Sequence, residues 1–327
     1  MEQIAFINGG TFIYWSSIIL TIAVVAAIAL FAGLYLWKSK NGMALSLTIP
    51  VALLLSVVMG RWIHWYCLTD SYESLNAAMT DYTWGGYALM GAFFGCLLTA
   101  VVMRLIHVSR NLPQMLDCMS LAGGVGIAVG RLAAMFNSSD RGQIVAETVG
   151  LPFAYPVTNA VSGAAENRLA TFMLQSMATG VIVVLIVLGM IISALRKKKM
   201  RDGDVTLLFI LMYGACQIIL DSTRYDSLFM RSNGFVSIVQ ILGLVAVVIA
   251  IVLYSIRMIK ARGFKWYLVL FWVLQLAMMG GAGYMEYYVQ RHGDQAAFAY
   301  SVMTPCLLGI VLVTLVIRAI AAAKEEN

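Results

Sequence analysis

Charged and polar side chains recur inside otherwise apolar stretches of this sequence. The clearest group contains Tyr213, Gln217, Asp221 and Arg224, which are spaced at i, i+4, i+8 and i+11. In a helix this spacing places all four side chains on one face. An arginine or aspartate inside a membrane span costs about 2.5–3.5 kcal/mol on insertion scales, so each one needs a partner or a function.

Two further groups share this character. Arg61 and His64 lie one helical turn apart near the end of one apolar run, and Arg131 lies near the end of another. Several polar residues follow Arg131 directly, namely Asn137, Ser139, Asp140 and Arg141. Because a guanidinium forms bidentate, charge-assisted hydrogen bonds to phosphate oxygens, the three groups together predict a site for the phosphate of an anionic phospholipid.

These residues also have structural interpretations. Arg61 and Arg224 can extend toward lipid headgroups or act as structural ties to Asp221. A histidine near a membrane interface, such as His64, is more often structural than catalytic. Arg131 lies deeper in its run and precedes a polar turn, so its placement favours a function.

Nine apolar runs must position these groups. Of the 327 residues, 61% are hydrophobic and 12% are charged, whereas a soluble domain is about one quarter charged, so the composition excludes a soluble globular protein. Each run can cross the roughly 30 Å hydrocarbon core as a helix. We therefore predict an all-α integral membrane protein with about nine transmembrane helices at Phe12–Trp37, Ala44–Trp65, Trp84–His107, Met115–Phe136, Phe172–Leu195, Val205–Thr223, Val236–Met258, Trp266–Tyr288 and Ala297–Ile320.

The basic residues orient the predicted bundle. Every lysine and half of the arginines lie on alternate connections, and basic residues favour the cytoplasmic side. The prediction is an N-terminus outside the cell and a cytoplasmic C-terminus, with the polar groups in the outer half of their helices and Asp117 near the cytoplasmic side. This topology explains the net charge of +6, which gives no support for nucleic-acid binding.

Other motifs predict neither a metal nor a cofactor. The five cysteines lack C-x-x-C and metal-ligand spacing, so we expect free thiols that pack against apolar neighbours. The stretch GGVGIAVG at residues 123–130 lacks the spacing and the preceding strand of a dinucleotide loop, and its glycines favour close helix packing instead. The longest predicted loop, residues 137–171, is a candidate substrate-facing element.

The run from Leu116 to Gln143, LDCMSLAGGVGIAVGRLAAMFNSSDRGQ, resembles the signature of the prolipoprotein diacylglyceryl transferase family. That signature contains an L-D pair and, fourteen residues after the aspartate, the arginine of G-R-x-G-N-F-x-N-x-E-x-x-G. The matching residues here are Asp117, Gly126, Gly130, Arg131, Asn137 and Gly142.

Four other segments are similar to the family in the same order along the chain. MYGACQIILDSTRYD, residues 212–226, resembles Y-G-x-x-R-x-x-x-E-x-x-R through Tyr213, Gly214, Asp221 and Arg224. The others are VMGRWIHWY at 58–66, WGGYALMGAFFG at 84–95 and LATFMLQS at 169–176. This chain departs from the family's pattern at Met90, where the family has histidine, at Gln217, where it has arginine, and at Ala134, Ser139, Leu169, Ala170, Leu174 and Gln175.

The resemblance implies a seven-helix transferase core at residues 1–258, followed by an additional membrane hairpin at residues 259–327. It implies transfer of the diacylglyceryl group of phosphatidylglycerol to the lipobox cysteine thiol of a prolipoprotein in the bacterial cytoplasmic membrane. The implied partners are phosphatidylglycerol, the prolipoprotein signal peptide and membrane lipids, and no cofactor is implied.

On this interpretation the predicted catalytic residues are Arg131, Arg224, Asp221 and His64, with Asp221 or His64 as the base for the thiol. The predicted phospholipid-binding residues are Arg61, Arg131, Asn137, Gly142, Gln217 and Tyr213.

Two alternatives remain open. The replacements at Met90 and Gln217 favour a catalytically inactive relative that binds anionic phospholipid. A lipid or small-molecule transporter is favoured only if the added hairpin completes a polar path across the membrane.

Overall fold

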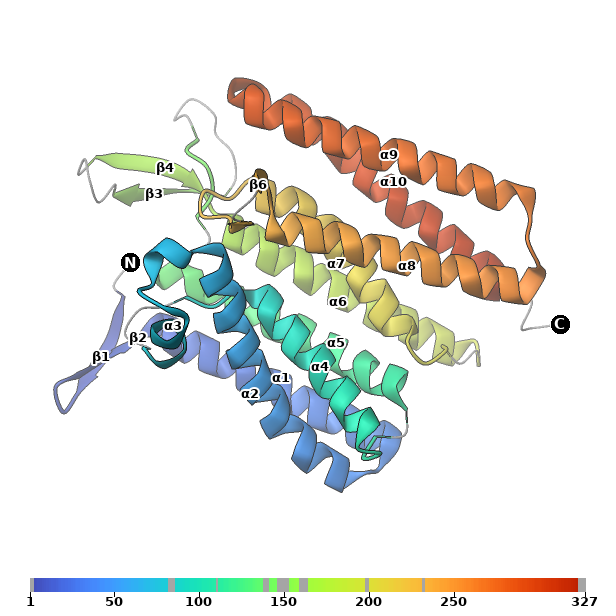
Figure 1. Cartoon of the computed structure of the whole chain (residues 1–327), viewed down its shortest axis with the longest axis horizontal. Coiled ribbons are helices and arrows are strands. Elements are labelled where there is room, and N and C mark those ends of the chain that lie inside the picture. The colour runs from blue at the N-terminus through green and yellow to red at the C-terminus, as the bar shows by residue number, and fades with distance from the viewer. Residues whose placement is uncertain are drawn as a thin grey trace. The chain divides into compact units, whose positions relative to one another are not determined.

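Helices dominate the structure, a computed structural model that describes residues 3–81, 86–109, 111–137, 141–145, 153–158, 164–197, 200–230 and 233–322 (Figure 1). The helices are α1 (Trp15–Ser39), α2 (Gly42–Cys67), α3 (Leu75–Thr80), α4 (Leu89–Leu105), α5 (Leu112–Gly130), α6 (Thr171–Leu195), α7 (Asp204–Ser222), α8 (Ile238–Arg262), α9 (Trp266–Arg291) and α10 (Ala296–Ala322). Three two-stranded sheets pair β1 (Ile4–Asn8) with β2 (Thr11–Tyr14), β3 (Ala154–Thr158) with β4 (Ala165–Leu169), and β5 (Phe229–Met230) with β6 (Asn233–Ser237).

The predicted all-α, multi-pass membrane protein is confirmed. Within the described residues, eight helices are long and apolar enough to cross a membrane, and α4 is a shorter apolar helix. The third predicted run, Trp84–His107, is helical only from Leu89 to Leu105, and Trp84 lies outside the described residues. The fourth run changes at Arg131 from an α-helix to a tighter 3₁₀ turn, Arg131–Phe136.

The first helix begins three residues later than predicted, because the chain before it forms a hairpin. β1 and β2 pair antiparallel around Gly9 and Gly10, whose φ angles of +57° and +85° suit glycine. Both strands are rich in β-branched and aromatic residues, which favour extended backbone. The Gly-Gly turn between two such segments was therefore a usable hairpin signal in the sequence.

The chain forms two compact units. Unit 1 contains residues 1–209 and 223–234, and unit 2 contains residues 210–222 and 235–327. The boundary therefore crosses α7, and α8 belongs to the same unit as α9 and α10. The division at residue 258 that the sequence suggested follows the family resemblance and stays a prediction.

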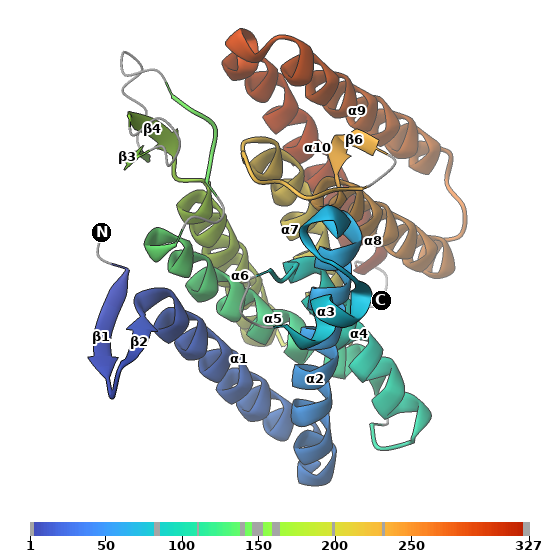
Figure 2. The same cartoon turned by 60° about the vertical axis from the view of Figure 1, so that its left-hand side comes forward.

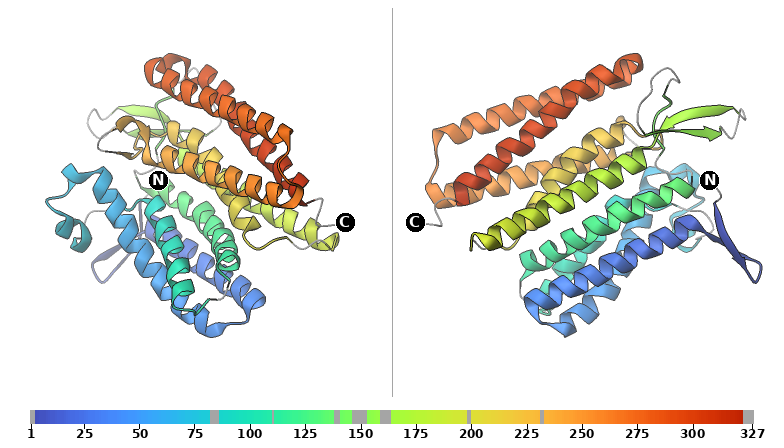
Figure 3. Two further views of the ribbon diagram at one scale, coloured as in Figure 1. Left: turned by 45° about the vertical axis from the view of Figure 1, so that its right-hand side comes forward. Right: turned by 180° about the vertical axis from the view of Figure 1, so that it is seen from behind.

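In unit 1, α1 packs along α5, α5 along α6, and α2 along α4 (Figures 2 and 3). α2 and α4 approach each other closely at two glycines of α4. A Cβ atom on Gly95 would lie 2.5 Å from the Cα atom of Ser56, and one on Gly91 would lie 2.3 Å from the carbonyl oxygen of Met59. Glycine permits this backbone contact between membrane helices. Next to it lies an apolar core of Phe31, Tyr35, Ala44, Ala100, Met103, Met115, Cys118 and Ala122.

The two ends of unit 1 differ. The sheets β1–β2 and β3–β4 lie at one end of its helices, here called the hairpin end (Figures 1 and 3). At the opposite end, the buried Asp117 carboxylate accepts hydrogen bonds of 2.8 Å from the Gly203 N–H and from the N–H and hydroxyl of Thr206. These groups lie at the start of α7, whose first N–H groups have no partner within the helix. Asp117, the aspartate of the signature, therefore caps α7.

In unit 2, α10 packs against both α8 and α9. The apolar core contains Leu211, Ala215, Val247, Ala250, Ile251, Ala282, Met303, Leu307, Ile310 and Val311. α7 and α8 approach closely at Gly214 and Gly243. A Cβ atom on Gly214 would lie only 2.7 Å from the carbonyl oxygen of Gly243. A buried polar contact joins the last two helices, in which the Gln275 amide donates to the Thr314 hydroxyl at 2.8 Å.

We predict that Gly95→Ala weakens the packing of α2 against α4, because the added methyl group overlaps the Ser56 backbone. Overpacking costs typically about 1–3 kcal/mol, so the purified variant should melt at a lower temperature in detergent. Gly33→Ala on α1 is the matched control, since no atom lies within 4 Å of its added Cβ. Equal melting temperatures for the two variants would contradict the close contact.

Candidate functional site

Arg131 lies where α5 ends and the 3₁₀ turn begins, at the hairpin end of unit 1. Its side chain is partly buried, and its Nε atom is shielded from solvent. The turn ends at Asn137, whose N–H donates to the Ala134 carbonyl at 3.4 Å. Ala134 packs with Ala170 and Phe172 at the start of α6. The signature turn is therefore held against α6, which fixes the backbone from which the Arg131 guanidinium extends.

Gly142 occupies a site that only glycine fits. Its N–H donates to the Leu169 carbonyl at 2.9 Å, and a Cβ atom would lie 2.4 Å from that carbonyl and 2.6 Å from the Thr171 hydroxyl. Gly142 also forms a β-bridge with Arg224. The glycine of the signature thus brings the segment 141–145 against both the end of β4 and the chain that follows α7.

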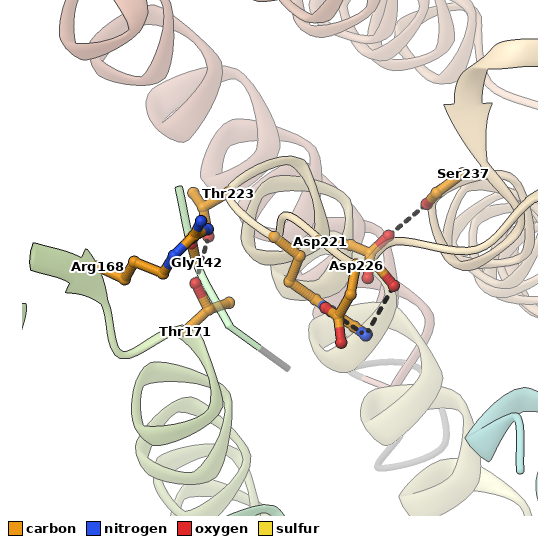
Figure 4. Close-up of polar contacts among 8 residues, drawn as sticks. Gly142, Arg168, Thr171, Asp221, Thr223, Asp226 and Ser237 are labelled. Atoms are coloured by element: carbon orange, nitrogen blue, oxygen red, sulfur yellow. Dashed lines mark hydrogen bonds and ion pairs between the residues drawn. The ribbon is translucent and has the colours of Figure 1, made fainter. Parts of the chain in front are cut away.

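Residues 141–145 lie where the end of β4, the start of α6 and the residues after α7 meet. The Gln143 N–H donates to the Thr223 carbonyl at 3.0 Å, and the Tyr225 N–H donates to the Arg141 carbonyl at 2.8 Å. Close by, the hydroxyls of Thr171 and Thr223 lie 3.0 Å apart (Figure 4). The start of α6 and the residues after α7 are therefore connected through residues 141–145.

Two arginines of this region are ion-paired. Arg168 is 8% exposed, contacts the Glu166 carboxylate at 2.9 Å and donates to the Gly142 carbonyl at 3.3 Å. Its guanidinium also lies over the Tyr225 ring, 4.6 Å from the centroid. Arg224 contacts the Asp226 carboxylate at 3.0 Å. The Arg168 guanidinium is thus held by a carboxylate and by the Gly142 carbonyl, whereas the Arg224 guanidinium is held by Asp226 and its backbone by the bridge to Gly142.

A third arginine adds positive charge to this region. Arg141 is partly buried, and among the described residues its Nε has no hydrogen-bond partner. Burial raises the pKa of the nearby Tyr155 hydroxyl, Arg141 and Arg168 lower it, and Asp226 raises it. The charges of Arg141, Arg168 and Asp226 therefore all act on the Tyr155 hydroxyl. We call Arg141, Tyr155, Arg168, Arg224 and Asp226 the arginine cluster.

The sequence argument missed most of this cluster. Arg168, Tyr155 and Asp226 carry no helical spacing that links them to Arg131 or Arg224, and β3–β4 was not predicted. The alternation of exposed and buried residues along β4, AENRL, was the available signal for Arg168. Of the predicted residues, Gly142 and Arg224 lie in direct contact, while Ser139 and Asp140 lie outside the described residues.

Arg61 is fully buried near the end of α2 and serves as a connector. It is 1% exposed, and it donates to the carbonyl oxygens of Ala78, Asp81 and Gly86, the last at 3.0 Å. These bonds hold α3 and the chain before α4 against α2. In the structural interpretation of Arg61, its guanidinium joins α2 to these two segments through the three backbone carbonyls.

His64, also near the end of α2, contacts the chain between α2 and α4. Its Nδ1 atom lies 2.8 Å from the Tyr72 hydroxyl, and the two rings meet edge to face. The Arg61 guanidinium lies 5.1 Å from the Tyr72 ring centroid. A Cβ atom on Gly86 would lie 2.6 Å from His64 Cε1, so the glycine leaves room for the imidazole.

Tyr213, Gln217 and Asp221 lie along α7 in unit 2, and all three are at most 4% exposed. The Asp221 carboxylate accepts a hydrogen bond from the Ser237 hydroxyl (Figure 4). Ser237 is the N-cap of α8 and forms a capping box with Gln240. Asp221 therefore connects the end of α7 to the start of α8.

The described residues contain no group of three or more His, Cys, Asp or Glu side chains that could hold a metal ion. All five cysteines are free thiols. The chemistry available at the hairpin end of unit 1 is therefore that of arginine, tyrosine and carboxylate groups. Such groups can bind an anion and stabilise negative charge as it develops.

Comparison with known proteins agrees with this description. The sequence model of the prolipoprotein diacylglyceryl transferase family matches residues 3–256. Phosphatidylglycerol–prolipoprotein diacylglyceryl transferase of Finegoldia magna is 24% identical over 263 residues, which cover 80% of this chain and 99% of that protein. The proteins of the same name from Bacillus licheniformis and Lactococcus lactis subsp. cremoris are 25% and 26% identical, over 67% and 62% of this chain and 77% and 74% of their own lengths.

The fold is thus that of a multi-pass membrane protein, and the family match makes it a transferase. The chain belongs to the prolipoprotein diacylglyceryl transferase family. The family match ends within α8, so α9 and α10 lie beyond it.

We predict that Arg61→Gln destabilises the protein, because it removes the charged donors from three backbone carbonyls. A hydrogen bond to a charged group contributes about 1.5–3 kcal/mol. The melting temperature in detergent should fall, and chymotrypsin should cut the α2–α4 connection, which contains aromatic residues such as Tyr72, faster. Arg104→Gln, at an exposed arginine of α4, should change neither quantity. An Arg61 variant with unchanged stability but weaker phosphatidylglycerol binding would instead support the predicted lipid contact.

Proposed function

We propose that this protein transfers the diacylglyceryl group of phosphatidylglycerol to the cysteine thiol of a prolipoprotein lipobox. The observation that carries this proposal is the position of the signature glycine, Gly142, which donates to the Leu169 carbonyl and is the β-bridge partner of Arg224 within an arginine-rich region. The names of the similar proteins support the two substrates.

The reaction requires negative charge to be stabilised on the leaving group. The cysteine sulfur attacks the glycerol carbon of the diacylglyceryl group, a carbon–sulfur bond forms, and the bond from that carbon to the phosphate oxygen breaks. Glycerol phosphate leaves with the electron pair, and the thiol proton passes to a base. Fixed guanidinium groups stabilise the charge that develops on the phosphate.

We assign this stabilisation to Arg131 first and to Arg224 second. Arg224 is held by Asp226 and the bridge to Gly142, so it starts from a fixed position. Asn137 and Gly142 would shape the turn around the headgroup, and Tyr213 and Gln217 would contribute from α7. Arg61 would act on the lipid only through its long-range charge, since its donors bond to backbone carbonyls.

The thiol has a reference pKa of about 8.5 and reacts as the thiolate. Asp221 and His64 are the proposed acceptors of its proton. One Asp221 oxygen accepts a hydrogen bond from Ser237, and His64 Nδ1 is hydrogen-bonded to Tyr72. The proton of the thiol would therefore go to the other carboxylate oxygen of Asp221 or to Nε2 of His64.

We further propose that the site faces the outer side of the bacterial cytoplasmic membrane, with the N-terminus outside and the C-terminus in the cytoplasm. Basic residues lie at the opposite end of unit 1 from the hairpins, including Lys38 and Arg104 at the ends of α1 and α4. Basic residues favour the cytoplasmic side, so this distribution supports the orientation. Both substrates would then enter sideways from the lipid.

A catalytically inactive, lipid-binding relative is the second candidate. Met90, 8% exposed in α4, and Gln217, 1% exposed in α7, stand where the family has histidine and arginine. Neither side chain can donate a proton or carry positive charge. This candidate keeps the phospholipid site and loses only the transfer step.

The deciding prediction is that purified protein forms a thioether-linked product from labelled phosphatidylglycerol and a lipobox peptide. Arg131→Ala should abolish both product formation and lipid binding, because the first phosphate ligand is lost. Lipid binding that depends on Arg131, without any product from the wild-type protein, would decide for the inactive relative.

A second prediction concerns Arg141, which the family pattern leaves unspecified. Arg141→Gln should raise the KM for phosphatidylglycerol about threefold to tenfold, because one charge-assisted bond to an anion is lost. Arg141→Lys should recover part of the affinity, and Arg104→Gln should behave like the wild type. An unchanged KM would exclude Arg141 from the headgroup site.

A further inference from the structure

The hairpin of α9 and α10 lies beyond the part of this chain that matches its family. The family match ends at residue 256. The Finegoldia magna protein aligns over 99% of its own length yet covers only 80% of this chain. A role for the hairpin must therefore be sought in what its side chains contact.

One side chain of the hairpin reaches the end of α7. The Tyr300 hydroxyl, on the second turn of α10, donates to the Ser222 carbonyl at 3.2 Å. The same hydroxyl lies 3.3 Å from the Ser222 hydroxyl, which can donate to it in return. A phenol oxygen can make both bonds at once. Tyr300 is therefore joined twice to a single residue.

Ser222 is the last residue of α7, where carbonyl groups have no partner within the helix. Tyr300 thus caps the C-terminal end of α7 from another helix. Ser222 directly follows Asp221 and precedes Arg224 by two residues. Whatever fixes Ser222 also fixes the last turn of α7, which carries Asp221.

Contacts from α8 converge on the same end of α7. The Ser237 hydroxyl donates to Asp221, and the Gln240 amide donates to the Ile218 carbonyl at 3.0 Å. α8 and the hairpin of α9 and α10 therefore hold the last turn of α7 from different helices.

We propose that Tyr300 is a positioning residue of the transferase, through which the hairpin of α9 and α10 fixes the last turn of α7, which carries Asp221. This inference rests on the proposed transferase function. The Tyr300 ring also packs against the apolar core of unit 2, so the hydroxyl can be removed while the ring contact is kept.

The test compares Tyr300→Phe with Tyr284→Phe in the full-length purified protein. Tyr284 lies on α9 and is 60% exposed, so it is a matched control on the same hairpin. Tyr300→Phe should lower kcat about tenfold with little change in the KM for phosphatidylglycerol, since displacements of about 1 Å can cost up to a hundredfold. Rates are expressed per folded molecule, so that loss of folded protein does not imitate the effect.

A variant series separates the two hydrogen bonds. Ser222→Ala removes one bond and keeps the carbonyl acceptor, so its kcat should fall less than that of Tyr300→Phe. The double variant should be no slower than Tyr300→Phe alone. Wild-type kcat in Tyr300→Phe, or equal losses in Tyr300→Phe and Tyr284→Phe, would overturn the proposal.

Backbone amide exchange supplies a readout that does not need activity. In Tyr300→Phe, residues 219–222 should exchange faster than in the wild type, and in Tyr284→Phe they should not. If the wild-type protein forms no thioether product, the proposed function fails, and the exchange result still decides whether Tyr300 fixes this segment. Unchanged exchange in Tyr300→Phe would overturn the positioning role.

Discussion

The cost of placing charged groups among apolar helices governs this structure. Water is absent from the hydrocarbon core, so a buried guanidinium or carboxylate must find its partners in the protein. Arg61 donates to three backbone carbonyls, and Asp117 accepts from three donors at the start of α7. In each case one ionised side chain satisfies backbone groups that a helix end or a loop leaves open. The charges thereby fix the connections between helices.

The same requirement produces an ordered region at the hairpin end of unit 1. Residues 141–145 lie between β4 and the chain after α7, where backbone hydrogen bonds form on both sides. Arg168 and Arg224 are balanced by Glu166 and Asp226, whereas Arg141 has no such carboxylate contact within the described chain. Backbone hydrogen bonds and carboxylates therefore hold these residues in place, and the three arginines outnumber the two carboxylates. A preorganised group of this kind stabilises an anion without first having to rearrange.

Close backbone contact is the second physical theme. Gly91 and Gly95 bring α4 against α2, Gly214 and Gly243 bring α7 against α8, and Gly142 lies against Leu169. Lipid provides little hydrophobic drive for helix association, so close packing and hydrogen bonds must supply it. In unit 2, the hairpin of α9 and α10 combines an apolar core with polar contacts such as that of Gln275 with Thr314.

The sequence alone determined the membrane class, the approximate helices and the family, because apolar length and the spacing from Asp117 to Gly142 are local properties of the chain. It also identified Arg131, Gly142 and Arg224 as candidates. Tertiary structure decided what each polar group contacts: Arg61 bonds to carbonyls 17 to 25 residues away, and Tyr300 bonds to a serine 78 residues away. It also revealed β3–β4 and the arginine cluster. Such pairings arise from the packing of distant segments, and no periodicity in a single sequence encodes them.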